Sequence, residues 1–192
     1  KIYLKNGLVH IFTVGKYEQR KNLLMMAEVI GELSANYNVR LTIAGECSTG
    51  FHREYYKKLK DYVEKAGLND KVTLLQNLSR IEMNRLYAET DLFVIPSTLE
   101  PASISQLEAM AFSIPVICSN TNGSACYVKS GHNGFLFEDN NKDDLKEAVE
   151  KVIKDRKLLV QMGQNSYQDI KNNYQFANYF EGIMECVRYL EG

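Results

Sequence analysis

The chain has 192 residues, of which 45% are hydrophobic and 24% are charged, and its formal net charge at pH 7 is −1. This length suffices for one globular domain, or for one lobe of a larger protein. The near-neutral charge disfavours nucleic acid and anionic membrane surfaces as partners. No stretch approaches the roughly 20 apolar residues of a membrane span. The first apolar run is too short and too mixed for a signal peptide, so we expect none.

Six short apolar runs, rich in β-branched residues, alternate with longer amphipathic segments up to about residue 155. Their hydrophobicity is continuous, which is typical of parallel strands that are covered on both faces. The expected strands are Leu8–Val14, Val39–Ala44, Lys71–Leu75, Asp91–Ile95, Ile114–Cys118 and Gly134–Phe137.

Helical patterns separate these strands. The expected helices are Lys21–Asn36, Arg53–Leu68, Ser79–Glu89, Ser103–Phe112 and Asn141–Asp155, and Arg156–Gly192 is purely helical, ending in a helix over Ala177–Gly192. Ser79 with Glu82 fits a capping box, and Asn141 with Asp144 fits a second capped start. The alternation predicts the α/β class, with a Rossmann-like doubly wound parallel sheet of about six strands, right-handed crossovers and C-terminal helices across one edge.

The cysteines and histidines show no metal-binding pattern. Cys47, Cys118, Cys126 and Cys186 lie far apart without a C-x-x-C pair, and the three histidines are equally scattered. A structural zinc site is therefore disfavoured. We expect reduced thiols, no metal and a cytoplasmic location.

In a doubly wound sheet, ligands bind outside the carboxyl ends of the strands. The loop "VGKYEQRKN" after the first strand places Lys16, Arg20 and Lys21 after Gly15. It has neither a dinucleotide fingerprint nor a P-loop, but three cations beside a strand end suit a phosphate or diphosphate. An ordinary solvated lysine-rich loop explains these charges equally well.

The stretch "PSTLEPASISQLEAM" follows the fourth strand. A helix that begins near Ser103 offers free N–H groups to an anion, with Glu100 just outside it and Glu108 inside its first two turns. Carboxylates accept hydrogen bonds from vicinal hydroxyls, and two such groups on either side of a diphosphate describe a nucleotide sugar. The alternative is a solvent-facing Glu100 and a locally paired Glu108, although the apolar neighbours of Glu108 disfavour an unpartnered carboxylate.

The run "PSTLEPASISQLEAMAFSIPVICS" resembles the P-S-x-x-E-G-F-G-x-x-x-x-E-A-M-A-x-G-x-P-V-I signature of retaining, family-4-type glycosyltransferases with the GT-B fold (glycosyl transferases group 1). "VGKYEQRKNL" is similar to the family's G-R-x-x-x-K-G, and "SGHNGFLF" to its e-N-G-f-l-f. The matches follow the family's order over nearly the whole chain. The resemblance implies that residues 1–192 form the C-terminal, nucleotide-sugar-binding lobe and that the N-terminal acceptor lobe is absent from this chain.

The resemblance also implies residue roles. Lys16 and Lys21 would hold the donor diphosphate beside Gly15, Glu100 would contact the sugar, Glu108 would contact the ribose, and Glu100, Lys21 and Lys16 would be the catalytic residues. The backbone of Ala102, Ser103 and Ile104 would lie beside the sugar and phosphate, and the segment with Asn77, Ser79 and Ile81 near the base.

The implied activity is retaining hexosyl transfer from a UDP- or GDP-linked sugar to a hydroxyl acceptor, such as a glycan, glycolipid or polysaccharide precursor. No cofactor and no metal is expected. The acceptor and any membrane contact would involve the missing lobe, so the isolated lobe would be inactive.

Three features of the sequence depart from the family pattern and bear on donor identity. "EPAS" replaces E-G-F-G, Cys126 stands where an acid is usual, and Lys16 replaces a bidentate arginine with a point charge. Two alternatives remain open: a catalytically silent GT-B-like partner or regulatory subunit, and a GT-B epimerase.

Overall fold

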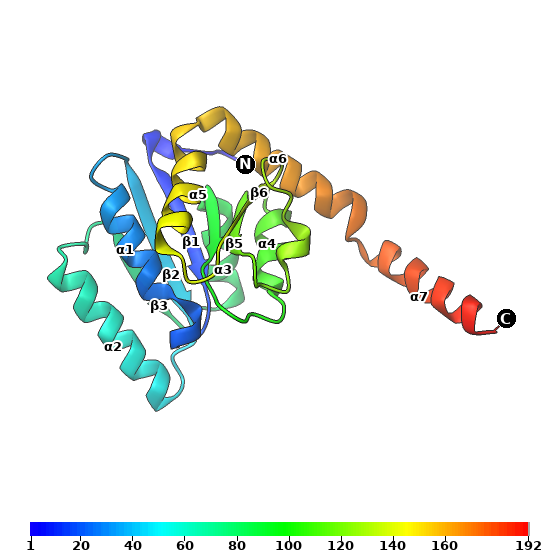
Figure 1. Cartoon of the computed structure of the whole chain (residues 1–192), viewed down its shortest axis with the longest axis horizontal. Coiled ribbons are helices and arrows are strands. Elements are labelled where there is room, and N and C mark those ends of the chain that lie inside the picture. Colours follow the sequence, from blue (N-terminus) through cyan, green and yellow to red (C-terminus); the bar gives the residue numbers. More distant parts are fainter. Residues whose placement is uncertain (192) are drawn as a thin grey trace.

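The computed structural model describes residues 1–191, which form an entirely parallel six-stranded sheet with helices on both faces (Figure 1). The strand order is β3-β2-β1-β4-β5-β6. All six expected strands are confirmed, with bounds β1 Val9–Val14, β2 Val39–Gly45, β3 Val72–Gln76, β4 Leu92–Ile95, β5 Val116–Ser119 and β6 Gly134–Phe137. Every residue of β4 and β5 is buried, as their continuous hydrophobicity predicts.

The helices also lie where the amphipathic segments predict them. Their bounds are α1 Leu23–Leu33, α2 Gly50–Lys65, α3 Arg80–Glu89, α4 Ile104–Ala111, α5 Lys142–Lys154, α6 Arg156–Asn173 and α7 Phe176–Glu191, with short 3-10 helices η1 Lys5–Gly7, η2 Gln19–Lys21 and η3 Ala125–Tyr127. Both expected caps are present: Ser79 and Glu82 form a capping box, and Asn141 accepts a hydrogen bond from the N–H of Asp144. The first long helix starts later than expected, because Lys21 belongs to η2 and Asn22 adopts a left-handed conformation (φ 50°) before α1.

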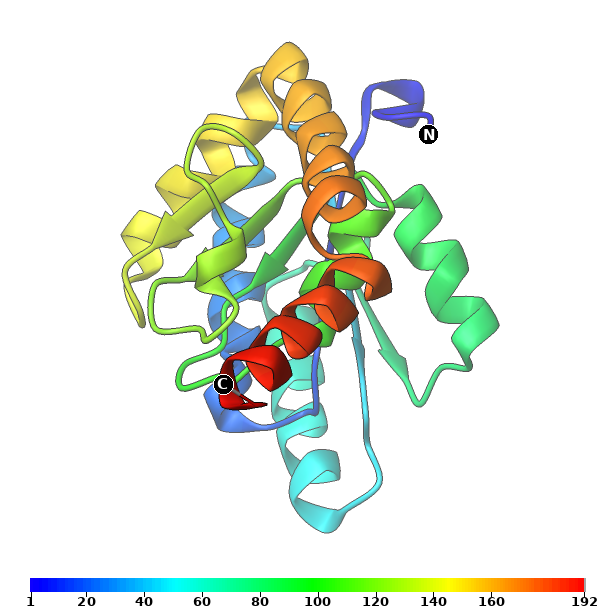
Figure 2. The ribbon, with the colours of Figure 1, turned by 90° about the vertical axis from the view of Figure 1, so that its right-hand side faces the viewer.

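Two hydrophobic clusters cover the two faces of the sheet. The first cluster joins β1 and β2 to apolar residues of α1, α2, α5 and α6, among them Ile30, Leu59 and Val149. The second joins β4 and β5 to α3 and α4 through residues such as Tyr87 and Met110. The sheet is therefore sandwiched between these two helical layers, which Figures 1 and 2 show from two sides.

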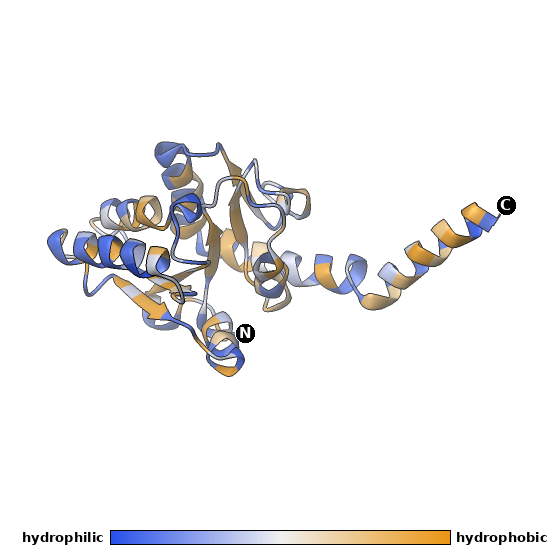
Figure 3. Ribbon diagram, turned by 90° about the horizontal axis from the view of Figure 1, so that it is seen from below, coloured by the Kyte–Doolittle hydropathy of each residue, from blue (hydrophilic) through white to orange (hydrophobic). Residues whose placement is uncertain are grey.

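The two C-terminal helices behave differently. Helix α6 packs against α4 and α5, whereas α7 has no buried residue and projects away from the body (Figures 1 and 3). The expectation that the last helices both cross one edge is thus wrong for α7. Seven large apolar side chains of α7 are exposed, namely Phe176, Tyr179, Phe180, Ile183, Val187, Tyr189 and Leu190. The expected helix over Ala177–Gly192 is confirmed up to Glu191, and Gly192 lies outside the described residues.

Two further expectations concern thiols and membrane spans. All four cysteines are free; Cys47 and Cys118 are buried, and Cys126 and Cys186 are exposed. Between residues 1 and 191, none of the helices has both the length and the apolar character needed to cross a membrane.

Candidate functional site

The candidate site lies where the strand order reverses. The chain leaves β1 toward β2 on one side, while β4 lies on the other side of β1. Loops that follow two such strands diverge and leave room for a ligand at their carboxyl ends. Here the two loops are joined by a hydrogen bond from the Thr98 N–H to the Arg20 carbonyl oxygen, 2.9 Å long. The basic loop and the glutamate loop that the sequence singles out therefore meet at the switch point.

Two cations share one carboxylate oxygen at this junction. Lys21 Nζ and Arg20 both donate to Oε2 of Glu100, the Arg20 bond being 3.1 Å long. The side chains of Lys21 and Glu100 are each only 11% exposed, so their ion pair is largely shielded from water. Arg20 is more exposed and pairs also with Glu18, at 2.8 Å. Without a ligand, the site neutralises its own charges.

Backbone geometry fixes the direction of Glu100. Leu99, just before it, adopts a left-handed conformation (φ 49°), which is uncommon for a residue with a Cβ atom. The N–H of Gly123, in the loop after β5, donates to the Glu100 carbonyl oxygen at 2.7 Å. A Cβ atom at Gly123 would lie 1.8 Å from the Pro101 carbonyl oxygen, so only glycine fits. The loop after β5 therefore supports the loop that carries Glu100.

Lys16 does not join the other two cations. Its Nζ lies 3.6 Å from Glu46 Oε2, at the end of β2. The hydroxyl of Ser48 and then the charge of Lys16 hold the pKa of Glu46 below its usual value. The three cations of the first loop are thus divided: Lys16 faces the β2 side, and Arg20 and Lys21 face the β4 side. Gly15 lies between them, and a Cβ atom there would come within 3.0 Å of Lys21 Cδ.

A cavity of about 470 Å³ opens on the β2 side of this junction. Its lining combines apolar side chains with the charged pair of Lys16 and Glu46, the mixture typical of small-molecule sites. The lining residues are Val14, Gly15, Lys16, Ala44, Gly45, Glu46, Asn77, Leu78 and Met83. Gly45 is required there, because a Cβ atom would lie 2.3 Å from the Gly15 carbonyl oxygen.

Of the segment 77–81, which is expected near a base, Asn77 and Leu78 line this cavity. Asn77 has a left-handed backbone (φ 50°), and its Oδ1 accepts from the Cys47 N–H at 2.9 Å. Ser79 is occupied as a helix cap, since its N–H and its hydroxyl both donate to Glu82 at 2.7 Å. Ile81 is exposed and does not line the cavity. Met83 of α3 also lines it, and the sequence pattern did not single out Met83 because it reads as an ordinary apolar helix residue.

The N-terminus of α4 lies beside Glu100 and Ala102, but one of its N–H groups is already used. Ser103 is the N-cap, as expected, yet its N–H donates to Ser124 Oγ at 2.6 Å. The N–H of Ser103 itself is therefore not among the free groups at the start of this helix. Within residues 1–191 the N–H groups of Ile104 and Ser105 have no such acceptor, and they remain available to an anion.

Glu108 ties α4 to α3. Its Oε2 accepts from the Tyr87 hydroxyl and its Oε1 from Arg80, both at 3.0 Å. Burial, and then the Glu108 carboxylate, raise the pKa of Tyr87 above its usual value. The Glu108 side chain is still 26% exposed, so its oxygens retain access to a ligand.

The described part of the chain contains no group of three or more His, Cys, Asp or Glu side chains placed to hold a metal ion. The chemistry that the observed groups offer is ionic and hydrogen-bonding: Lys16, Arg20 and Lys21 for an anion, and Glu100 and Glu108 for hydroxyl groups.

Comparisons with known proteins place the chain in a family. A relative in Methanocaldococcus jannaschii, described as an uncharacterized glycosyltransferase, is 29% identical over 88% of this chain and 42% of its own length. The UDP-Gal:alpha-D-GlcNAc-diphosphoundecaprenol alpha-1,3-galactosyltransferase of Escherichia coli is 30% identical over 91% of this chain and 44% of its own length. The chain thus spans somewhat less than half the length of these curated relatives.

A solved structure shares the fold over about nine-tenths of both chains. The crystal structure of the C-terminal domain of a glycosyl transferase group 1 family protein from Francisella tularensis superimposes with a TM-score of 0.81, at 22% identity, covering 91% of each chain. This likeness confirms the expected fold of a GT-B C-terminal lobe. The family model described as Glycosyl transferases group 1 matches residues 3–169. The chain therefore belongs to the glycosyl transferases group 1 family.

Proposed function

We propose that this chain binds a nucleotide-diphosphate sugar at the switch point and supplies the donor-binding half of a retaining hexosyltransferase. The observation that carries the proposal is the convergence of Lys21, Arg20 and Glu100 beside the cavity at the ends of β1 and β2. A diphosphate needs cations, and a sugar needs hydrogen-bond acceptors for its hydroxyl groups. Both lie within one connected site.

The proposed arrangement assigns each part of the donor to a part of the site. The cavity beside Asn77 would take the nucleoside, and Lys16, Lys21 and the free N–H groups of α4 would take the diphosphate. Glu100 would accept from sugar hydroxyl groups and Glu108 from the ribose. Ala102 and Ser103 would border the sugar through their backbone. The roles of Ser79 and Ile81 near the base have the least structural support, because neither lines the cavity.

In the proposed reaction, the bond between the anomeric carbon and the phosphate oxygen breaks, and an acceptor hydroxyl oxygen forms a bond on the same face. The electron pair leaves with the nucleoside diphosphate, and the hydroxyl proton goes to its phosphate oxygen. Lys16, Lys21 and the N-terminus of α4 would stabilise the charge that develops on the leaving group. We propose that these cations suffice without a metal or cofactor.

The relatives support a larger functional unit. Because the chain spans less than half of their length, we propose that a second lobe binds the sugar or lipid-linked acceptor and provides any membrane contact. The Escherichia coli relative is named for UDP-Gal and a diphosphoundecaprenol-linked sugar, which supports a UDP-linked donor and a glycolipid acceptor. We propose a GDP-linked donor as the alternative, and a cytoplasmic location. Closure of two lobes over the donor would be needed for transfer, so the 192 residues alone should bind without catalysis.

A second candidate function is a catalytically silent partner of the same fold. The exposed Cys126 in place of the usual acid favours it, whereas the pair of Lys21 and Glu100 argues against it. A GT-B epimerase remains the weaker alternative, since no observation favours it.

Titration of the 192-residue chain with UDP-, GDP- and ADP-glucose by calorimetry tests the proposal. One of the three should bind, and Lys21→Ala should weaken that binding about tenfold, since it removes a cation from the diphosphate. Lys58→Ala, an exposed lysine on α2, is the matched control and should bind like the wild type. Binding of none of these nucleotides, or equal binding by Lys21→Ala, would reject the donor site and leave the silent partner.

A further inference from the structure

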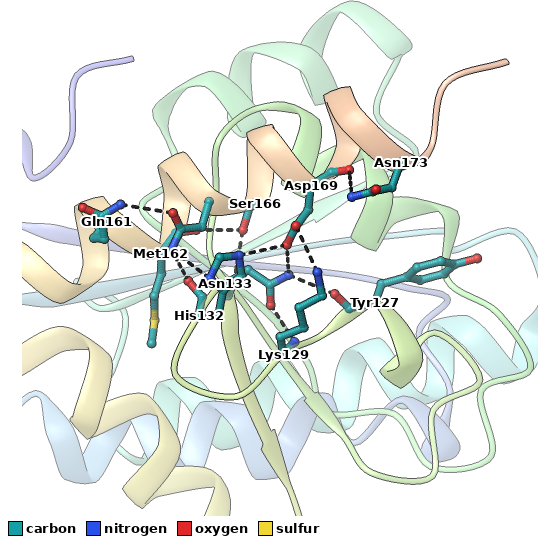
Figure 4. Close-up of polar contacts among 10 residues, drawn as sticks. Tyr127, Lys129, His132, Asn133, Gln161, Met162, Ser166, Asp169 and Asn173 are labelled. Carbon is teal, nitrogen blue, oxygen red and sulfur yellow. Dashed lines mark hydrogen bonds and ion pairs between the residues drawn. The ribbon is translucent and has the colours of Figure 1, made fainter. Parts of the chain in front are cut away.

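A buried polar network lies on the α6 side of the loop that joins β5 to β6 (Figure 4). At its centre is Asp169 of α6, whose side chain is shielded from solvent. Its Oδ2 accepts from Asn133 Nδ2 at 2.8 Å, and its Oδ1 accepts from Lys129 Nζ at 3.1 Å. His132 Nε2 lies 3.3 Å from Oδ2. The carboxylate therefore holds three residues of one loop against α6.

Asn133 links Asp169 to η3 through hydrogen bonds. It is fully buried, and its Nδ2 donates both to Asp169 and, at 3.0 Å, to the Tyr127 carbonyl oxygen. Its Oδ1 accepts from the Lys129 N–H at 2.8 Å. Every donor and acceptor of the amide group is thus used, so the side chain has one favourable orientation and fixes the position of Tyr127.

The other end of η3 holds the N-terminus of α4. Ser124, the N-cap of η3, accepts from the Tyr127 N–H at 3.1 Å through its carbonyl oxygen. The same carbonyl oxygen accepts from Gln106 Nε2 at 2.8 Å, and Ser124 Oγ accepts from the Ser103 N–H at 2.6 Å. Ser124 therefore decides where the first turn of α4 lies relative to Glu100.

We propose that Asp169 is a positioning residue for the diphosphate end of the donor site, acting through Asn133, η3 and Ser124 on the N-terminus of α4. This inference rests on the proposed function. A charged acceptor makes stronger hydrogen bonds than a neutral one, so the carboxylate is the firmest anchor of the loop. A purely structural Asp169 would stabilise α6 without affecting how the site distinguishes a nucleoside diphosphate from its nucleoside.

The test compares Asp169→Asn with Lys129→Ala in the 192-residue chain. Asp169→Asn keeps the shape of the side chain but removes its charge. Lys129→Ala removes the bond from Lys129 Nζ to the same carboxylate. It leaves the Asn133 bonds to Asp169 and Tyr127 in place. Calorimetry measures the affinity of each variant for UDP, GDP and their nucleosides, and amide NMR spectra of the ligand-free proteins report on Ser103 and Ile104.

We expect Asp169→Asn to weaken binding of the nucleoside diphosphate about fivefold and to leave nucleoside binding unchanged. This loss is smaller than the contribution of one charge-assisted hydrogen bond, because Asp169 acts on the ligand indirectly. It should also shift the ligand-free amide signals of Ser103 and Ile104. Lys129→Ala should change neither the nucleoside diphosphate affinity nor the nucleoside affinity by more than about twofold, because the Lys129 side chain is 55% exposed and exposed lysines contribute little through ion pairs. Equal losses for both ligands, or unmoved Ser103 and Ile104 signals, would overturn the proposal.

The two proposals fail separately. If the wild type binds no nucleotide, the proposed function is wrong, and the ligand-free signals still decide whether Asp169 sets the position of α4. If Asp169→Asn does not fold, Asp169→Glu replaces it, because the longer side chain keeps the charge and the Lys129 pair but displaces the carboxylate from Asn133. The same loss of preference for the diphosphate is then expected.

Discussion

Replacement of Glu100 by glutamine should separate the sugar part of the site from the diphosphate part. Glu100 is the anionic partner of the shielded Lys21, whereas Arg20 keeps a second partner in Glu18. Removing one partner of a buried ion pair costs about 3–5 kcal/mol. The cost should be smaller here, because the pair is partly exposed and the glutamine side chain still offers an oxygen to Lys21. We therefore expect the free energy of unfolding to fall by about 2 kcal/mol.

The same variant should affect two ligands differently. A hydrogen bond to a charged acceptor contributes about 1.5–3 kcal/mol, so binding of the nucleotide sugar should weaken about tenfold or more. Binding of the bare nucleoside diphosphate should stay equal or become tighter, because Lys21 and Arg20 are released from Glu100 and become free for phosphate oxygens. Calorimetry with both ligands, at low and at high salt, measures the two affinities.

Glu32→Gln is the matched control for this experiment. Glu32 also pairs with two cations, Lys142 at 3.0 Å and Lys146 at 2.6 Å. It lies on α1 beside α5, away from the carboxyl ends of the strands. It should leave both affinities unchanged. Equal losses of nucleotide sugar and nucleoside diphosphate in Glu100→Gln would refute the assignment of Glu100 to the sugar.

Three further outcomes are expected. Lys21→Ala should weaken binding of the nucleotide sugar and of the nucleoside diphosphate equally, as measured by calorimetry, and this loss should shrink as the salt concentration rises. A loss that does not depend on salt would contradict a charge contact. Glu108→Gln should weaken binding of both ligands about tenfold, because both carry the ribose. Unchanged affinities would mean that Glu108 serves only as a structural partner of Tyr87. Burial lowers the pKa of His10 below 6.5, so the unfolded chain takes up the proton first and the free energy of unfolding should fall as the pH drops from 7 to 5. Denaturant unfolding followed by circular dichroism should show a smaller pH dependence in His10→Gln, and an equal dependence would contradict this assignment.

The sheet was predictable because its strands are short apolar runs and its central strands are almost completely buried. Leu92–Ile95 has all four residues buried, and no other element type explains so short a run between turns. The start of α4 was predictable for a similar local reason, since Ser103 precedes the first apolar helical residues. Both predictions depend on information within a few residues of chain.

The contacts of the site were less predictable because they join segments far apart in sequence. Lys16 pairs with Glu46 across two neighbouring strand ends, and Ser103 uses its N–H on Ser124, which follows a different strand. No local pattern encodes either contact. The network of Asp169 and Asn133 spans 36 positions, and the motif "SGHNGFLF" that contains Asn133 does not reveal its partner on α6. For α7, the apolar spacing predicts a helix but not what it packs against, so its exposed position was missed.

The most direct test of the donor site is amide NMR of the 15N-labelled chain titrated with the nucleotide sugar that binds in calorimetry. We expect the largest shifts on Gly15 and Lys21 in the first loop, on Glu100 in the loop after β4, on Ile104 at the start of α4, and on Asn77 in the cavity. Titration with the bare nucleoside diphosphate should reproduce all of these except the shift at Glu100. Shifts confined to other surfaces, or none at millimolar nucleotide sugar, would contradict donor binding at this switch point.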